Sequence, residues 1–319
     1  MSTMDMTFDS YGCSLAGTYA EVADPVAAAL LISGSGKTDR DSDVKLPLGQ
    51  TLRGRITRAI AEALQGAAVS SLRYDKRGVG ASGGDYYTVG MERRLVDAQA
   101  ALGWLADRNP GLPLLVIGHS EGTLYAARLA AEDAHVAGIA LLSGSVRRGG
   151  DVLAWQTEQL ADKLPGAARL VLRLMRTDVV SAQRRNQARI MASTADILRL
   201  QGAKVNARWV RDFVAWDPSQ DLSRITVPVL AITGGHDLHV PPADVETMGK
   251  LVRGPFEGHV VGDLSHLLRP DPDAVGPRGY RRAAHQPVSG QVLGLITAWV
   301  AKHWSDAPSQ LTKRDGDLR

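Results

Sequence analysis

The stretch LPLLVIGHSEGTLYAARLA, residues 112–130, contains the pattern that decides the fold. Its first six residues form a short apolar run that is typical of a buried strand, and the residues from Thr123 to Ala130 favour a helix. Between them, residues 118–122 read G-H-S-E-G, and a serine with glycines two positions away on either side is typical of a tight strand-to-helix turn. Larger side chains beside such a turn would collide, and the strained backbone lifts the serine hydroxyl above the sheet edge. We therefore predict that Ser120 is a nucleophile.

The composition indicates a globular chain with a mixed surface. The chain has 319 residues, of which 44% are hydrophobic, enough to build a large core. Its 37 basic and 34 acidic residues leave a formal net charge of +3, a small excess that argues against a nucleic-acid partner. The apolar runs are shorter than the roughly 18 residues of a membrane span, so no membrane contact is expected. The single cysteine, Cys13, excludes an internal disulfide and favours a half-buried strand position.

Residues 1–10 are polar and acidic, and they lack the basic start and apolar core of a secretion signal. The expected location is therefore cytoplasmic. The sequence leaves the oligomeric state unknown.

Predicted strands and helices alternate along most of the chain, which favours a mostly parallel sheet covered by helices on both faces. The predicted strands lie at 26–32, 67–74, 112–117, 135–142, 227–233 and 256–261, after an N-terminal hairpin at 6–18. The predicted helices of the body lie at 52–64, 91–108, 123–130 and 287–303.

The alternation stops at residues 149–216, which contain no strand pattern and have leucines at helical spacing. Because this segment falls between two sheet strands, we predict that it forms a helical cap, or lid, over Ser120; an ordinary helical layer is the alternative. Its helices are expected at about 153–164, 170–174 and 183–200. The predicted organisation is a core over 1–148 and 217–304, a cap over 149–216 and a polar tail over 305–319.

A serine hydroxyl needs a base that accepts its proton and a third group that orients the base. In proteins with this strand–turn–helix pattern, the acid and then the histidine follow the serine along the chain. Asp237 lies in the loop after the predicted strand 227–233, and His266 lies in the loop after the next one. The alternatives to His266 are His259, which falls within that next strand, and His285 farther along. We predict that Asp237 orients His266 and that His266 is the base.

Two backbone N–H groups are expected to bind the oxyanion of the tetrahedral intermediate. One is the N–H of Glu121, the residue after the predicted nucleophile. The other belongs to the loop S-G-S-G at 33–36, where we favour Ser35 and keep Gly34 as the neighbouring possibility.

Two other site types are not expected. The loop continues as G-K-T at 36–38, which resembles the end of a phosphate-binding loop, but the full pattern requires a glycine where this chain has Leu31. The run H-D-L-H at 236–239 could suggest metal ligands, but no further ligand follows at a suitable spacing. We therefore expect no nucleotide, no metal and no other cofactor.

Together these features resemble the bacterial α/β-hydrolase esterases of the dienelactone-hydrolase-like and serine-aminopeptidase-like group. The resemblance covers roughly residues 5–303 and implies an α/β-hydrolase fold. It depends on S-G-S-G at 33–36 with D-R-D at 39–41, Y-D-K-R-G-V-G-A-S at 74–82, the G-H-S-E-G turn, W-D-P at 216–218, G-G-H-D at 234–237 and L-S-H at 264–266. The chain departs from the family's loop at Lys37, where the family often has proline.

These residues favour a serine hydrolase that cleaves carboxylic esters of short to medium acyl chains through an acyl-enzyme, with a small-molecule ester as its partner. The same machinery suits a peptidase or amidase, or a thioesterase or acyltransferase. The non-enzyme alternative is a binding protein for a small ligand. We also predict that Asp39, Asp41 and Arg77 form a charged brace beneath the loop at 33–36.

Overall fold

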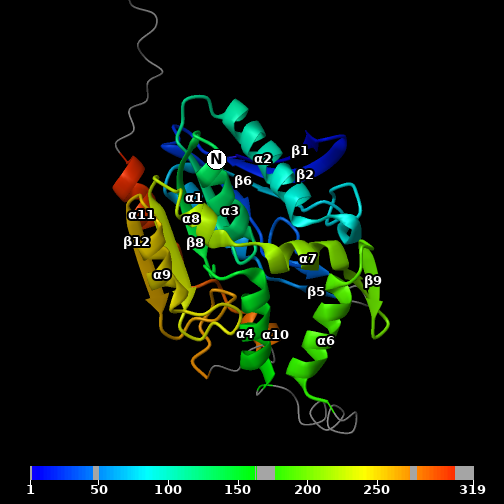
Figure 1. Cartoon of the computed structure of the whole chain (residues 1–319). Coiled ribbons are helices and arrows are strands. Elements are labelled where there is room, and N and C mark those ends of the chain that lie inside the picture. The colour runs from blue at the N-terminus through cyan, green and yellow to red at the C-terminus, as the bar shows by residue number, and fades with distance from the viewer. Residues whose placement is uncertain (1, 46–49, 162, 164–176, 274–278, 306–319) are drawn as a thin grey trace, which may run out of the picture.

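The computed structural model describes residues 2–45, 50–161, 163, 177–273 and 279–305 (Figure 1). Its centre is an eight-stranded sheet in the order β1-β2-β6-β3-β7-β8-β11-β12. β2 pairs antiparallel with β1 and with β6, and from β6 onward each neighbouring pair is parallel. These strands are β1 (Ser2–Ser10), β2 (Cys13–Glu21), β3 (Ala27–Ile32), β6 (Val69–Tyr74), β7 (Leu114–His119), β8 (Val136–Leu142), β11 (Val229–Gly234) and β12 (Phe256–Val261).

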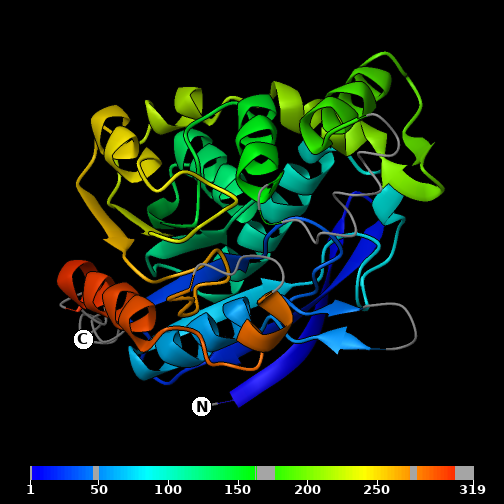
Figure 2. The same ribbon diagram turned by 90° about the horizontal axis from the view of Figure 1, so that it is seen from below.

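Helices cover both faces of the sheet (Figure 2). One face packs against α1 (Ile56–Gly66) and α11 (Gly290–Trp304). The other packs against α2 (Met91–Arg108), α3 (Gly122–Glu132), α8 (Pro218–Leu222) and α9 (Asp244–Leu251). The smaller body elements are β4 (Val44–Lys45), β5 (Thr51–Leu52), the 3-10 helix η2 (Tyr86–Thr88) and α10 (Tyr280–Ala283).

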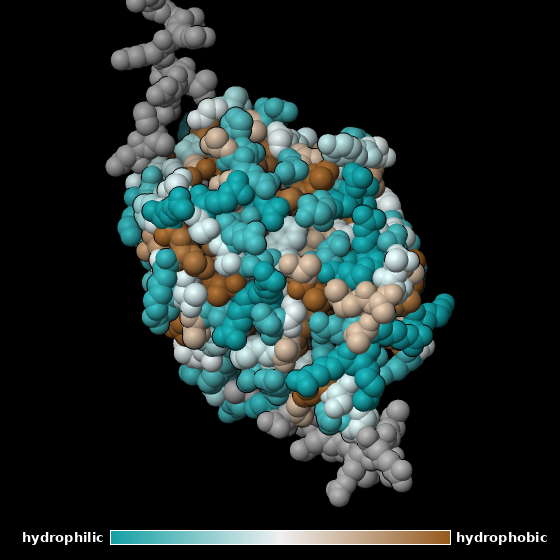
Figure 3. Space-filling model, in the orientation of Figure 1, coloured by the Kyte–Doolittle hydropathy of each residue, from teal (hydrophilic) through white to brown (hydrophobic). Residues whose placement is uncertain are grey.

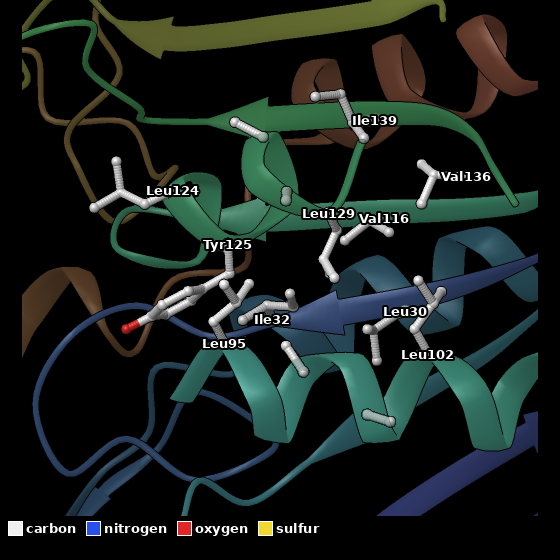
Figure 4. Close-up of a cluster of buried hydrophobic side chains, with 14 of the residues drawn as sticks. Leu30, Ile32, Leu95, Leu102, Val116, Leu124, Tyr125, Leu129, Val136 and Ile139 are labelled. Carbon is white, nitrogen blue, oxygen red and sulfur yellow. The ribbon is translucent and has the colours of Figure 1, made fainter. Parts of the chain in front are cut away.

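Successive side chains of β3 alternate between two hydrophobic cores, one on each face of the sheet. Ala27, Ala29 and Leu31 belong to the core beside α1 and α11, whereas Leu30 and Ile32 belong to the core beside α2 and α3. Figure 4 shows this second core, in which Leu30 and Ile32 lie close to side chains of α2 and α3. Since neither face meets water, the strand is apolar at every position, as parallel strands usually are.

The described part of the segment 149–216 lies outside the main sheet and corrects one expectation. It contains α4 (Gly149–Ala161), α6 (Val179–Met191), β9 (Ile197–Leu200), β10 (Ala203–Asn206) and α7 (Ala207–Ala215). The prediction of an entirely helical segment, with one helix over 183–200, is wrong, because β9 and β10 form an antiparallel hairpin. Gln201 and Gly202 connect them with φ of 51° and 82°, the left-handed conformation of a tight two-residue hairpin turn. The helix expected at 170–174 lies outside the described residues.

The body differs less from expectation. The residue expected to begin the first helix, Leu52, ends the short strand β5, and α1 begins at Ile56. Cys13 is half-buried at the start of β2, as predicted. The face drawn in Figure 3 is mainly hydrophilic, with apolar residues in separate small groups. Among the described residues, the helices are all too short or too polar to cross a bilayer.

Candidate active site

The turn after β7 has the strained geometry that the sequence predicts. Ser120 adopts a left-handed backbone with φ of 54°. A Cβ atom on Gly118 would lie 2.3 Å from the Gly122 carbonyl oxygen, and one on Gly122 would lie 2.3 Å from the Ile32 carbonyl oxygen. Both contacts are shorter than any real packing distance, so only glycine fits on either side of Ser120. The Ser120 N–H donates to the Leu142 carbonyl at 2.9 Å, which ties the turn to β8.

The three residues predicted as a triad lie in one hydrogen-bonded chain. His266 Nε2 lies 3.0 Å from Ser120 Oγ, and His266 Nδ1 lies 2.8 Å and 3.0 Å from the two carboxylate oxygens of Asp237. An ionised carboxylate only accepts hydrogen bonds, so Nδ1 carries the proton and Nε2 is free to accept from the serine hydroxyl. The rival residues lie elsewhere: His259 contacts Glu257 on β12, and His285 is exposed.

Asp237 is buried yet held as a carboxylate. Its Oδ1 accepts the backbone N–H groups of His239 at 2.8 Å and Val240 at 3.1 Å. Burial alone would raise the pKa of Asp237, but the charge and hydrogen bond of His266, with the His239 N–H, outweigh burial and lower the pKa. The fixed negative charge suits the stabilisation of an imidazolium on its neighbour.

Two further histidine rings flank His266. The ring of His239 lies 4.4 Å from that of His266 between centroids, and the ring of His119 lies 5.2 Å from it. Burial, aided by the charge of His266, lowers the pKa of both flanking histidines to about 3, so both are neutral at neutral pH. His119 Nε2 lies 2.9 Å from the His266 carbonyl oxygen and must donate, because a carbonyl only accepts. His119 therefore holds the backbone of the predicted base.

A small cavity of about 70 Å³ adjoins Ser120. The body contributes Ser35, Glu121 and Ser143 to its wall. The inserted segment 149–216 contributes mainly apolar side chains, namely Val152, Leu153, Trp209, Phe213 and Trp216, together with Gln156. The structure thus brings residues of α4 and α7 to the predicted nucleophile, as a lid over Ser120 would require.

The two predicted oxyanion donors lie on this cavity. Among the described residues, the backbone N–H groups of Ser35 and Glu121 donate no hydrogen bond, so both are available to a ligand. The loop of Ser35 approaches Ser120 closely, because a Cβ atom on Gly34 would lie 3.2 Å from Ser120 Cβ.

The side chain of Glu121 takes part in a buried cluster that sequence reasoning missed. Its carboxylate accepts hydrogen bonds from Arg94 at 2.8 Å, Tyr125 at 2.5 Å and Trp209 Nε1 at 3.1 Å. Burial alone would raise the pKa of Glu121, but the charges of Arg94 and Lys76 and the bonds from Tyr125 and Trp209 outweigh burial and lower it. One signal was present in the sequence: Arg94 lies on the apolar stripe of its helix, where an arginine needs a buried partner.

The predicted brace of Asp39, Asp41 and Arg77 beneath the loop at 33–36 is wrong, because each of the three side chains binds a different partner outside that loop. Asp41 pairs with Arg73 at 2.6 Å, and Asp39 accepts backbone N–H groups of its own loop. Arg77 instead pairs with Asp97 on α2 at 2.5 Å, because the turn after β6 directs it toward that helix.

A different ion pair supports the loop that carries Ser35. Arg40 pairs with the buried carboxylate of Asp75 at 2.8 Å, and the Arg40 backbone N–H donates to the same side chain at 2.7 Å. This pair links the loop after β3 to the end of β6.

Comparison with known proteins agrees with this architecture. Residues 53–273 match the sequence model of the serine aminopeptidase S33 family of hydrolases. The chain belongs to this family. The α/β-hydrolase fold predicted from the sequence is thereby confirmed.

Named relatives and solved structures extend the likeness. Esterase EstD of Thermotoga maritima is 25% identical over 286 residues, which cover 87% of this chain and 63% of EstD, so the chain spans less than two thirds of that relative. The structure of Est1E from Butyrivibrio proteoclasticus with ferulic acid bound superposes with a TM-score of 0.63 at 17% identity, covering 94% of this chain and 99% of Est1E. The Pyrococcus furiosus esterase Pf2001 superposes with a TM-score of 0.60 at 16% identity, covering 95% of this chain and 92% of Pf2001.

Proposed function

We propose that this protein is a serine hydrolase that cleaves carboxylic esters of short to medium acyl chains. The observation that carries the proposal is the hydrogen-bonded chain from Asp237 through His266 to Ser120, beside a cavity that can hold an acyl group. The esterase names of EstD, Est1E and Pf2001 support ester substrates over amides and thioesters.

The proposed reaction has two steps. His266 Nε2 accepts the hydroxyl proton of Ser120 as Oγ bonds to the ester carbonyl carbon. When the tetrahedral intermediate collapses, its bond to the alcohol oxygen breaks, and the imidazolium gives its proton to that oxygen. Water then attacks the acyl-enzyme in the same way, its proton passing to His266 and then to Ser120, which releases the acid.

Two groups of residues support these steps. The N–H groups of Ser35 and Glu121 bind the developing oxyanion, where preorganised donors cost no reorganisation during the reaction. The segment 149–216 acts as the cap, since its side chains wall the cavity and keep water from the acyl group.

The cavity supports the proposed chain length. With a volume of about 70 Å³, it suits a short acyl chain better than a long one. Each methylene that fits contributes about 0.8 kcal/mol, so kcat/KM is expected to rise over the first few carbons and to fall once the cavity is full.

The test is kcat/KM on p-nitrophenyl esters from acetate to palmitate, with matched amides and thioesters, and with the Ser120→Ala variant as the control. A fluorophosphonate probe should label Ser120, which separates an enzyme from a binding protein. Preference for palmitate would point to a lipase, and preference for amides or thioesters would reject ester hydrolysis as the main reaction.

A further inference from the structure

The peptide bond between Gly34 and Ser35 is held on its carbonyl side by two donors, the half-buried Thr38 and the buried Lys76. Thr38 Oγ1 donates to the Gly34 carbonyl oxygen at 2.9 Å, and Lys76 Nζ donates to the same oxygen. Lys76 Nζ also donates to Thr38 Oγ1, so the three groups form one closed cluster. Lys76 lies two residues after the end of β6 and Gly34 two residues after the end of β3, and these two strands are parallel neighbours whose ends meet at one edge of the sheet.

Because the Gly34–Ser35 peptide is planar, the restraint on the Gly34 carbonyl also restrains the Ser35 N–H. In a trans peptide, the carbonyl of one residue and the N–H of the next point in opposite directions. The chain has no cis peptide bonds among its described residues, so fixing the Gly34 carbonyl also fixes the Ser35 N–H. That N–H has no acceptor among the described residues, and Ser35 lies on the cavity wall with Ser120.

We infer that Lys76, with Thr38, is the positioning residue that aims the Ser35 N–H at the oxyanion. This inference rests on the proposed function, because it assigns a role within the same acyl-transfer site. Lys76 touches no reacting atom and acts only through the Gly34–Ser35 peptide.

The surroundings of Lys76 fit a role as a hydrogen-bond donor. Its side chain is buried, and the charged groups that act on it are Glu121, Arg94, Asp39 and Asp75. Burial lowers the pKa of Lys76 from 10.5 to about 7, against the opposing charge of Glu121. A neutral amine keeps N–H groups, so the bond to the Gly34 carbonyl persists when the proton is lost.

The test compares variants that remove one donor each. Lys76→Met keeps most of the side-chain bulk without the amine, and Thr38→Val removes the hydroxyl. Thr38→Ser restores the hydroxyl and is the rescue, and Lys250→Met makes the same exchange at an exposed lysine of α9. Each variant is first checked for folding by thermal unfolding.

Three measurements separate positioning from a merely structural role. Losing a well-placed oxyanion donor costs about 10²–10³ in kcat, and we expect Lys76→Met to lose on the order of 10² with KM changed less than about threefold. The rate of Ser120 phosphonylation by a fluorophosphonate should fall by a similar factor, because the phosphoryl oxygen occupies the same site. The affinity for a trifluoromethyl ketone, which forms an anionic adduct with Ser120, should fall as well.

Thr38→Val should show the same pattern with a smaller loss, on the order of 10-fold, whereas Thr38→Ser and Lys250→Met should behave as wild type. The inference is overturned if folded Lys76→Met and Thr38→Val keep wild-type phosphonylation rates. If Lys76→Met does not fold, the phosphonylation rate of Thr38→Val tests the inference by itself.

Failure of the proposed function gives a different result. If wild-type Ser120 is phosphonylated but hydrolyses no ester, the proposed substrate class is wrong, and the phosphonylation rates still test Lys76. If wild-type Ser120 does not react with the probe, both proposals are rejected.

Discussion

The sheet body and the inserted segment 149–216 bury their side chains very differently. Every residue of β3 and of β7 is buried. In the segment, α4 buries only Gly149 and Val152, and α6 buries only Ile190. The body therefore has the close packing that fixes atoms to within fractions of an ångström, whereas the segment presents half-buried side chains to the cavity.

A few polar contacts join the two regions. Trp209 Nε1 donates to Glu121, and Gln156 donates to the His239 carbonyl at 2.8 Å. Asn206 donates to the Val89 carbonyl at 2.8 Å. The difference in burial between the two regions suggests a division of labour in which the body performs the chemistry and the segment selects the substrate, and five predictions test that comparison.

The largest effect is expected at the proposed nucleophile and the proposed base. Ser120→Ala and His266→Ala should each lower kcat by a factor of about 10⁴–10⁶ while binding is largely kept, because they remove the attacking atom or its proton acceptor. Steady-state kinetics on a short p-nitrophenyl ester is the measurement, with thermal unfolding as the control for folding. A Ser120→Ala variant that kept more than about a tenth of the activity would show that the assignment is wrong.

The next largest effect is expected for Asp237→Asn, which should lower kcat by a factor on the order of 10⁴. The amide can donate to Nδ1 and so favours the wrong imidazole tautomer, although the shape of the site is kept. Retention of the wild-type kcat would mean that another group orients His266.

The buried pair of Arg94 and Glu121 should matter for stability. Arg94→Met leaves Glu121 charged without its partner and should lower the free energy of unfolding by about 3–5 kcal/mol. The matched control is Arg108→Met, which breaks an exposed pair with Glu21 and should cost less than about 1 kcal/mol. Urea unfolding at neutral pH measures the free energy of unfolding of both variants. Equal losses in the two variants would contradict the expected difference between a buried and an exposed ion pair.

The pH dependence of this pair has a definite sign. Because the pKa of Glu121 is lowered from 4.5, the folded state binds fewer protons than the unfolded state as the pH falls below 4.5. The contribution of Glu121 to stability is therefore complete above pH 4.5 and is lost as the pH falls through the lower folded pKa. The stability difference between wild type and Glu121→Gln should shrink in that acid range.

The smallest effect is expected in the segment. Phe213 stacks on Trp209 with ring centroids 5.0 Å apart and lines the cavity, so Phe213→Ala should change the chain-length profile more than the chemistry. We expect about a 10-fold change in kcat/KM for the longest ester that wild type accepts, and less than about twofold for acetate. Met191→Ala, at an exposed site of α6, is the control. Equal losses on acetate and on the longer ester would assign Phe213 to the chemical step.

The sequence predicted the body better than the segment for a physical reason. Strands buried on both faces are mostly apolar, so β3, β7, β8 and β11 are visible as apolar runs. The residues Ser120, Asp237 and His266 could be selected because they follow strand ends in a fixed order. The hairpin of β9 and β10 has no such signal, since its strands are four residues long and each has only one buried residue.

Contacts made through space were also missed. The bonds of Lys76 to Gly34 and of Arg94 to Glu121 join residues 42 and 27 positions apart in the chain. They depend on the order of the strands and the rotation of α2, neither of which a local pattern encodes. For the same reason Arg77 was assigned to the wrong carboxylate.

The left-handed backbone of Ser120 has a consequence for evolution in the laboratory. A residue with a Cβ atom in this conformation costs roughly 1–2 kcal/mol relative to glycine. A library screened only for resistance to heat should therefore enrich glycine at position 120, and the most durable clones should include inactive ones. Selection for heat resistance and selection for catalytic activity favour different residues at position 120. A screen for heat-resistant catalysts therefore has to select for both properties at once.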